Sequence, residues 1–524
     1  MWLATVLAVS ISLTGCGRRE ARADLIILNG AEPESLDPAV VTGQAEMRLV
    51  VALFEGLARF DPRTGEPIPG LAERWEKSED GLRYTFHLRS NAVWSTGEPI
   101  TSEDFVYSWR RLLDRKTAAD YAELLYCLKN GQDFNLGKIQ DPDQVGVKAA
   151  DPHTLLVELK RPTAFFIELC ALPALAIVPR QAIAQHGDRW LRAKPLPVSG
   201  AYLLDEWRVH DRIRFRRNPL YWDAARTRNE SVDLLPVESA NLAMNLYKTG
   251  QADIIWDKTL IPTELMDALK NERDCHLFNY LGTYFFRFNV NRPPLNDPRV
   301  RKALALVVDK NRIVEKITRA GEEPANHFTP SGIARYQPPA GLGYDPEQAR
   351  RLLAEAGYPG GRGFPRFQYL LNAKKMSEQI GIELQAMWRK ELGIQIDLRQ
   401  MEWKVYLATQ SKQDYDLSAS SWIGDYNDPN TFLEIFRANN GNNRTGWKSA
   451  RYDNLIEQGN LQTDPARREE MLREAELLLV RDEVPIVPLW FWKGVTFFDD
   501  QKIEGIYFNV VDEHPLNSIA RKKG

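Results

Sequence analysis

Hydrophobic and polar residues follow two different periods within one stretch of this chain. From Tyr84 to Leu88 they alternate one by one, which is the pattern of a half-buried β-strand. A break at Gly97 follows, and Thr101 then stands three residues before Asp104, close to the arrangement of a helix capping box. The next apolar residues recur at helical spacing, at Phe105, Trp109, Leu112 and Leu113. The stretch therefore predicts a strand, a turn and a capped helix.

The same patterns predict further elements along the chain. An Asp-Pro pair supplies an N-cap and a proline at the first helical position, so we expect helices to begin after Asp297, Asp345 and Asp464. Strand-like runs are Leu25–Leu28, Thr154–Leu159, Arg212–Arg216, Ile394–Leu398 and Val484–Trp490. The last run contains Pro485 and Pro488, which is typical of an edge strand. Strands that alternate with helices predict an α/β fold.

Length and composition describe a soluble protein of more than one domain. At 524 residues the chain is too long for a single core, and we expect two or three domains. Apolar residues make up 44% and charged residues 27%, which is ordinary for a globular protein. The net charge is only −3, so the charge balance gives no support for nucleic acid as a partner.

The beginning of the chain carries an export signal. The apolar run from Trp2 to Leu13 is too short to cross a bilayer, but it has the length of the apolar part of a secretory signal. It ends in Leu-Thr-Gly-Cys, which matches a lipobox and predicts lipid attachment at Cys16. We expect a signal peptide over residues 1–15, a tether over 16–23, and a protein held at the cell envelope by its lipid. The alternative is a short apolar segment with a chance cysteine.

The remaining cysteines and the histidines predict no catalytic or metal chemistry. Apart from Cys16, the cysteines are Cys127, Cys170 and Cys275, without a CxxC pair, so at most one disulfide can form and we expect buried free thiols. The seven histidines are scattered, with no pair at metal-ligand spacing. HExxH, GxSxG and P-loop motifs are absent from the sequence. We therefore expect no metal, no cofactor and no enzymatic activity.

Several segments, in order along the chain, resemble those of one protein family. The stretch from Tyr84 to Arg111 resembles a signature of the oligopeptide- and dipeptide-binding proteins of peptide ABC transporters, which are family 5 of the extracellular solute-binding proteins. The further segments are Glu32–Pro38, Leu53–Leu57, Asn296–Leu304 and Leu352–Tyr358. Each motif is weak alone, but their shared order across nearly the whole chain is specific.

The resemblance implies an α/β, two-lobed periplasmic-binding-protein (Venus flytrap) fold with an extra third domain. Carried onto this chain, it assigns lobe I to residues 24–54, 179–281 and 492–524, the extra domain to 55–178, and lobe II to 282–491. It also implies a monomer that takes up short peptides between the lobes and delivers them to the permease subunits of an ABC importer.

The resemblance also implies an anchor for the amino terminus of the peptide. Asp425 matches an aspartate that receives the peptide's α-ammonium group, and Ser421, Trp422 and Ile423 precede it in the sequence and would contact the ligand. A desolvated carboxylate suits this role, because an amino terminus is the one cation that every free peptide has. An extended peptide backbone could pair with the neighbouring strand. The alternative is an ordinary Asx turn, since Asp, Asn and Pro gather in loops.

Further ligand contacts follow from the same resemblance. Trp403 matches a residue that lines a side-chain pocket, although a place in the core is an equal alternative. Tyr121 matches a tyrosine that covers the ligand from the extra domain. Thr42, Gly43 and Gln44 are expected to form a lobe I strand that pairs with the peptide.

At the other end of the peptide the resemblance breaks down. The family places His or Arg at positions that are Ser377, Gln410 and Ala419 here, and none of these can pair with a carboxylate. A disulfide of some relatives is also missing, because its positions are Gly282 and Ile423. Three alternatives stay open: a solvated carboxylate in a longer peptide, another cation such as Arg335 or Lys374, or a ligand without that group.

Two other functions compete with peptide binding. The first keeps the fold but binds a non-peptide solute, such as an oligosaccharide, a metal chelate or an antibiotic-like amine. The second is a secreted hydrolase of cell-wall peptides that uses paired carboxylates, and it would show turnover.

Overall fold

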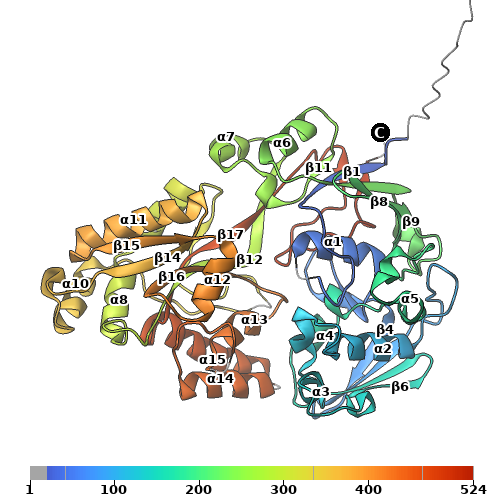
Figure 1. The fold of residues 1–524 in the computed structure, drawn as a ribbon, viewed down its shortest axis with the longest axis horizontal. Coiled ribbons are helices and arrows are strands. Elements are labelled where there is room, and N and C mark those ends of the chain that lie inside the picture. The colour runs from blue at the N-terminus through green and yellow to red at the C-terminus, as the bar shows by residue number, and fades with distance from the viewer. Residues whose placement is uncertain (1–20, 42, 334–335, 439, 463, 523–524) are drawn as a thin grey trace, which may run out of the picture.

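The computed structural model describes residues 21–41, 43–333, 336–438, 440–462 and 464–522. Cys16, Thr42 and Arg335 lie outside these residues. One mixed sheet runs through most of the molecule in the order β15-β14-β16-β12-β17-β11-β1-β10-β9-β8 (Figure 1). Its strands are β1 (Leu25–Gly30), β8 (Tyr202–Arg208), β9 (Arg212–Arg217), β10 (Ser231–Pro236), β11 (Ile254–Ile255), β12 (Cys275–Phe288), β14 (Phe367–Asn372), β15 (Ile396–Met401), β16 (Leu417–Ile423) and β17 (Ile486–Phe498), and the short β13 (Glu323–Pro324) pairs with β17 beside this row.

Two long strands carry this sheet from one half of the molecule to the other. β12 and β17 are antiparallel and lie between the two lobes in Figure 1. Their register shifts between Asn279 and Thr283, which leaves Tyr280–Gly282 on β12 as a bulge. We call the part around β1 and β8–β11 the first lobe and the part around β14–β16 the second lobe. The exact domain boundaries given above stay predictions.

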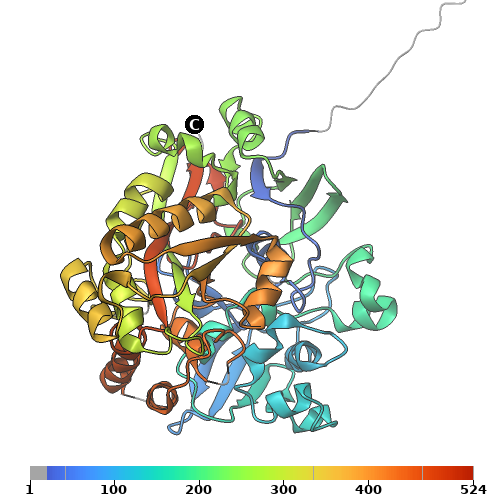
Figure 2. The same ribbon diagram turned by 60° about the vertical axis from the view of Figure 1, so that its left-hand side comes forward.

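Helices cover the sheet in both lobes. In the second lobe, α11 packs on β14 and β15, and α10 packs against α8 and α11 (Figure 2). The second-lobe helices are α8 (Pro298–Leu306), α9 (Lys310–Ile313), α10 (Pro346–Glu355), α11 (Lys375–Leu392), α12 (Trp403–Ser411), α13 (Asn430–Leu433), α14 (Ala450–Leu461) and α15 (Pro465–Leu477). The first-lobe helices are α1 (Gln44–Leu53), α5 (Arg180–His186), α6 (Ala240–Lys248) and α7 (Met266–Leu269).

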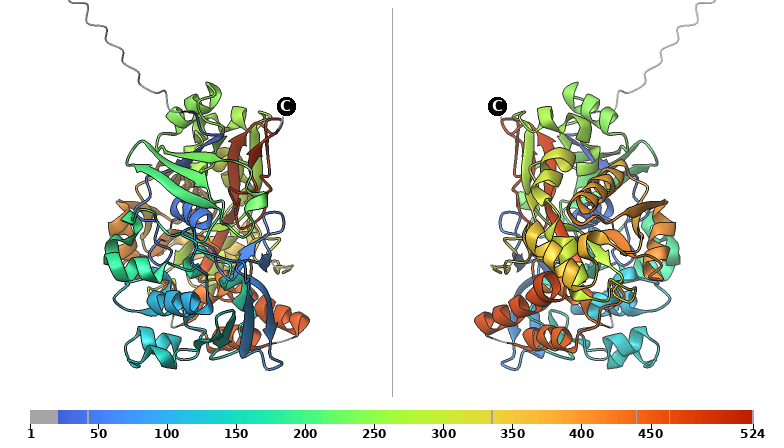
Figure 3. Two further views of the ribbon diagram at one scale, coloured as in Figure 1. Left: turned by 90° about the vertical axis from the view of Figure 1, so that its right-hand side faces the viewer. Right: turned by 90° about the vertical axis from the view of Figure 1, so that its left-hand side faces the viewer.

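A third region with its own core lies beside the first lobe. Its antiparallel sheet has the order β4-β5-β7-β6, and α2 packs against this sheet. Its other elements include a short β2–β3 hairpin and the helices α3 and α4. The bounds are β2 (Ala58–Phe60), β3 (Pro67–Pro69), β4 (Ala72–Lys77), β5 (Arg83–Leu88), β6 (Val147–Asp151), β7 (Thr154–Glu158), α2 (Ser102–Leu113), α3 (Gly131–Asn135) and α4 (Phe166–Leu169). In both side views of Figure 3 this blue and cyan region lies at the same end of the molecule as α14 and α15.

The helix starts predicted from local sequence are confirmed. Thr101 and Asp104 form the capping box of α2, in which the carboxylate of Asp104 accepts a hydrogen bond from the Thr101 amide at 2.8 Å. Asp297, Asp345 and Asp464 cap α8, α10 and α15 with their side chains. These helix starts were predictable because in each one a side chain accepts a hydrogen bond from a backbone amide within three positions.

The prediction of an edge strand at Val484–Trp490 is wrong for the sheet as a whole. β17 has β12 on one side and β11 on the other, where Phe497 and Phe498 pair with Ile255 and Ile254. The prolines are tolerated because the start of β17 lies beyond the reach of β11. Pro488 faces Phe285 of β12, next to a second register shift, and pairing on the other side of β17 begins only after it, where the Ala325 amide donates to the Leu489 carbonyl and β13 pairs with Trp490 and Phe491.

Candidate functional site

One edge of β16 is open near the middle of the molecule. β16 pairs with β12 along its whole length, but its pairing with β14 ends at Ser418. The Gln410 side chain donates to the carbonyl of Ala419 at 2.8 Å, and beyond it no strand of the described chain pairs with this edge. The unpaired stretch therefore leads from Ser420 along Ser421, Trp422 and Ile423 toward Asp425.

A tight loop after β16 holds Asp425. The Asp425 amide donates to the hydroxyl of Thr431 at 3.0 Å, and the indole of Trp422 donates to the Thr431 carbonyl at 2.7 Å. Gly424 is needed at this turn, since a Cβ there would meet the Phe432 ring at 2.8 Å. Tyr426 points the other way and stacks on Phe165 of the third region at 4.7 Å between ring centroids. The loop is thus fixed from both sides.

The Asp425 carboxylate has no cation beside it in the described part of the chain. Burial raises its pKa to about 6, while the hydrogen bond from the Tyr121 hydroxyl lowers it and the charge of Glu123 raises it. Tyr121 lies in a short 3-10 helix (Asp120–Leu125) of the third region, and its hydroxyl is 3.3 Å from Oδ1 of Asp425. A partly buried carboxylate without an ion pair is suited to binding a cationic group from outside.

A cavity of about 940 Å³ lies along the open edge of β16. Ser421, Trp422 and Ile423 line it from the second lobe, together with residues of α11 and α12. Lys258, Thr259 and Met266 line it from the first lobe, so both lobes form its walls. Tyr121 and Asp425 are not among its lining residues and lie beyond the Ile423 end of the strand.

The predicted strand at Thr42–Gln44 is wrong where the structure describes it. Gly43 is the N-cap of α1 and Gln44 is the first helical residue. The following residues explain this, because Ala45 and Glu46 favour a helix and place an acidic side chain in its first turn. The carboxamide of Gln44 donates to the Tyr280 hydroxyl, so this segment meets the bulge of β12 instead of forming a strand.

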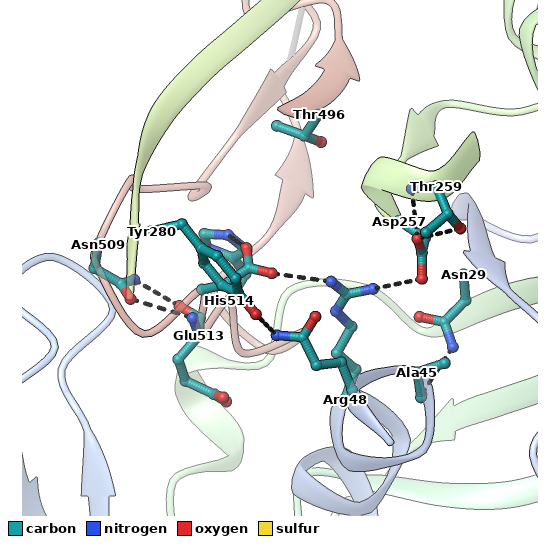
Figure 4. A network of polar contacts seen from close by, with 12 residues as sticks. Asn29, Ala45, Arg48, Asp257, Thr259, Tyr280, Thr496, Asn509, Glu513 and His514 are labelled. Atoms are coloured by element: carbon teal, nitrogen blue, oxygen red, sulfur yellow. Dashed lines mark hydrogen bonds and ion pairs between the residues drawn. The ribbon is translucent and has the colours of Figure 1, made fainter. Parts of the chain in front are cut away.

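Figure 4 shows the polar network around this contact. Arg48 of α1 lies 3.0 Å from Oδ2 of Asp512 and 3.9 Å from Oδ2 of Asp257. His514 lies 2.9 Å from Oδ1 of Asp512. Burial raises the pKa of Asp512, but His514 and Arg48 outweigh it and leave that pKa below its usual range. The network therefore connects α1 with the region where β12 and β17 pass between the lobes.

The three positions where the resemblance predicts a cation hold neutral residues whose polar groups bond within the protein. Ser377 is buried and its hydroxyl donates to the side chain of Asn372. Gln410 donates to the hydroxyls of Tyr406 and Ser418, each at 2.7 Å. Ala419 contributes only its carbonyl. Lys374, one of the alternative cations, is exposed and lines the cavity.

Two arginines of the cavity wall were missed by the sequence reasoning. Arg287 of β12 and Arg444, which follows the loop after α13, both line the cavity. Within the described chain neither forms an ion pair with a carboxylate. A signal for Arg287 existed, because it is a lone charge in the apolar run Tyr284–Phe288. Arg444 has no comparable signal in its polar surroundings.

The remaining predictions concern Trp403, the cysteines, and possible metal or membrane-spanning segments. Trp403 begins α12, and its side chain lies outside the described part of the chain. Cys127, Cys170 and Cys275 are free thiols as predicted, although only Cys170 is buried and the other two are partly exposed. Gly282 faces Ile423 across β12 and β16. Among the described residues no cluster of His, Cys, Asp or Glu could hold a metal ion. No helix in those residues has the length and apolar character needed to span a membrane.

Comparisons with known proteins agree with this architecture. Residues 66–444 match the sequence model described as "Bacterial extracellular solute-binding proteins, family 5 Middle". The chain is 37% identical to the periplasmic oligopeptide-binding protein OppA of Salmonella typhimurium, over 89% of this chain and 87% of that protein. It is 35% identical to the probable deoxycholate-binding periplasmic protein YgiS of Escherichia coli, over 88% and 87%.

A solved structure supports the same assignment. The murein tripeptide binding protein MppA of Escherichia coli superimposes with a TM-score of 0.80 at 32% identity, covering 96% of this chain and 99% of that one. The predicted α/β, two-lobed fold with a third domain is therefore confirmed. The chain belongs to family 5 of the bacterial extracellular solute-binding proteins, and it is a binding protein and not an enzyme.

Proposed function

We propose that this protein is the substrate-binding lipoprotein of an ABC importer, which captures short peptides between its lobes and delivers them to the permease. The observation that carries this proposal is the open edge of β16, which leads to a carboxylate without a cationic partner among the described residues. An extended peptide needs a row of backbone groups and a partner for its ammonium group, and these two features supply both.

In this proposal Asp425 receives the α-ammonium group, with Tyr121 placed above it from the third region. The peptide backbone pairs with β16 at Ser421 and Ile423, and Trp422 lies beside it. Since residues of both lobes line the cavity, a ligand that bridges them binds the closed arrangement more tightly and shifts the population toward it. Water in a cavity of about 940 Å³ would allow side chains of different sizes.

The relatives support a peptide as the ligand. OppA is named for binding oligopeptides and MppA for binding a murein tripeptide. The lipid anchor at Cys16, the monomeric state and the ligand contacts of Trp403, Thr42 and Gly43 stay predictions. The short strand once expected at Thr42–Gln44 is not part of the proposal.

One relative favours a second candidate within the same fold. YgiS is named as probably binding deoxycholate, a non-peptide carboxylate. The cationic residues of the cavity, among them Arg287, Lys258 and Lys316, would also suit such a solute.

Mass spectrometry of the ligand released from freshly purified, denatured protein distinguishes the peptide-binding proposal from the second candidate. A set of short peptides that share a length but not a sequence is the expected result. A single non-peptide anion, together with no thermal stabilisation by added peptides, would replace the proposal by the second candidate.

A further inference from the structure

Arg287 lines the cavity wall, and its guanidinium has no carboxylate partner among the described residues. The residue is 5% exposed. Its guanidinium donates to the Ser420 hydroxyl at 2.6 Å and to the Asn442 carbonyl at 3.1 Å, which are both neutral acceptors. Its Nε has no protein partner, and its Cζ lies over the Phe285 ring at 5.3 Å from the ring centroid. A buried guanidinium held only by neutral groups costs free energy compared with a paired one.

A second guanidinium adds to the same positive charge. Arg444 donates to the carboxamide oxygen of Gln410 at 3.1 Å, and its Nε is also buried without a protein partner. Burial is the main cause that lowers the pKa of Arg287, and the charge of Arg444 lowers it further. The two residues are also linked by geometry, since the Asn442 carbonyl accepts from the Arg287 guanidinium at 3.1 Å and from the Arg444 backbone amide at 2.9 Å. Both cations would gain from a shared anion.

The rest of the cavity wall has the same sign of charge. Its other cationic residues are Lys258, Lys316, Lys374 and Lys375, together with Arg319 and Lys493, which pair with Asp267 and Glu323. Its acidic residues are Glu264 and Glu322, and Glu322 accepts hydrogen bonds from Thr318 and the Ala320 amide. Burial lowers the pKa of Lys258 to about 8, although the nearby aspartates raise it. An excess of positive charge in a hollow concentrates anions there.

We propose that Arg287 and Arg444 form a subsite for a carboxylate of the bound ligand. This inference rests on the proposed function and deepens it, because it adds a requirement for an anion at the end of the cavity opposite Asp425. Ser420 and the Asn442 carbonyl hold the Arg287 guanidinium in place, and Gln410 holds that of Arg444. The carboxylate has two sources, which are the carboxyl terminus of the peptide and the side chain of an acidic residue.

The length of β16 sets which source reaches the subsite. Ser420, which bonds to Arg287, and Asp425 are five positions apart in the sequence. At about 3.3 Å per extended residue they are separated by at most roughly 17 Å. A peptide of about four or five residues, with its ammonium group at Asp425, would place its own carboxyl terminus near the two arginines. A longer peptide would reach them with an acidic side chain.

Two peptide libraries test this proposal on the whole protein. Random peptides of three to six residues are made with free carboxyl termini and, separately, as carboxyl-terminal amides, and the retained members are identified by mass spectrometry. We expect retention of free peptides of about four or five residues whatever their sequence. We expect amides to be retained as strongly as free peptides only where they contain Asp or Glu, and more weakly otherwise.

The outcomes separate the two proposals. Equal retention of both libraries, without enrichment of acidic residues, would overturn the carboxylate subsite and leave peptide binding in place. Retention of acidic peptides alone in both libraries would support the subsite and assign it to side chains. Failure to retain either library would overturn peptide binding and the subsite together.

Substitutions then locate the subsite. In R287Q and R444Q we expect free peptides to bind at least about tenfold more weakly, the scale of a charged hydrogen bond, while amides without acidic residues change little. R292Q is the control: Arg292 follows β12 and pairs with Asp414 and Asp416, away from the cavity. Thermal melting of the unliganded variants shows that they are folded. An equal loss for free and amidated peptides in folded R287Q and R444Q would contradict the assignment.

Discussion

The Tyr121 hydroxyl lies 3.3 Å from Oδ1 of Asp425, although 304 positions separate the two residues in the chain. The third region thus touches the second lobe at the proposed ammonium site. Tyr426 strengthens the same contact by stacking on Phe165. The third region therefore does more than enlarge the protein, because it shapes the environment of the carboxylate that the proposed function depends on.

Replacing Asp425 by Asn should weaken the binding of free peptides by about 1.5–3 kcal/mol, which is the range for a hydrogen bond to a charged group. The change keeps the shape of the side chain and removes its charge. Isothermal titration calorimetry with a free peptide and its N-acetylated form measures the effect. The acetylated peptide has no ammonium group and should lose less. An equal loss for both, or no loss for either, would exclude Asp425 as the anchor.

Peptide affinity should fall as the pH drops through about 6. The pKa of Asp425 is raised to about 6 mainly by burial, so the carboxylate becomes neutral below that pH and no longer attracts the ammonium group. Because the Tyr121 hydrogen bond lowers this pKa, Y121F should move the midpoint of the affinity-pH curve upward. Titrations between pH 5 and pH 8 give the curves. A midpoint that stays in place or moves down in Y121F would show that the hydroxyl does not act on Asp425.

Lys310 should make the free energy of unfolding rise with pH above 7. Its ammonium group is buried, bonds to the Ala325 carbonyl at 2.7 Å and to Asn326 at 3.0 Å, and burial lowers its pKa to about 7. The unfolded chain keeps this proton up to about pH 10, so between these values it binds more protons than the folded state. The slope from this one group is at most about 1.4 kcal/mol per pH unit.

Urea denaturation of the native protein and K310M from pH 7 to pH 9 measures this slope. The difference in unfolding free energy between native protein and variant should increase with pH. Curves that run parallel would mean that Lys310 keeps its proton in the folded state.

Arg48 should be important for stability because it neutralises two acidic groups. The substitution R48M leaves Asp512 and Asp257 without their cation, and removing one partner of a buried ion pair costs about 3–5 kcal/mol. Chemical denaturation measures the loss. The double variant R48M/D512N should recover a part of it, since it removes the stranded charge as well. Simple addition of the two single losses would show that the residues do not interact.

Local signals explain which elements could be predicted. α8, α10 and α15 begin at Asp-Pro pairs whose hydrogen bonds close within a few residues, so no knowledge of the rest of the chain is needed. The place of β17 in the sheet depends on β11 and β12, which lie more than 190 positions away in the sequence. The prolines of its first half could not reveal that its second half is interior.

The candidate site also contains some residues that could be predicted from the sequence and others that could not. Ser421, Trp422 and Ile423, which the resemblance singled out as ligand contacts, line the cavity, whereas Arg287 and Arg444 were missed. A charged residue in an apolar run is an ambiguous signal. Arg301 is also buried, but its guanidinium bonds to the carbonyls of Leu295, Glu483 and Val484 and has a structural role. Only the three-dimensional neighbours distinguish the two arginines.

The open edge of β16 has a consequence for the empty protein. Unpaired strand edges recruit strands from other molecules, which makes them starting points for aggregation. The backbone groups from Ser420 to Ile423 that would hold a peptide could equally pair with a misfolded neighbour. The positive charge of the surrounding wall discourages this, because a second copy of the same wall is repelled. A peptide bound as proposed would cover this edge, so occupancy would favour solubility as well as closure.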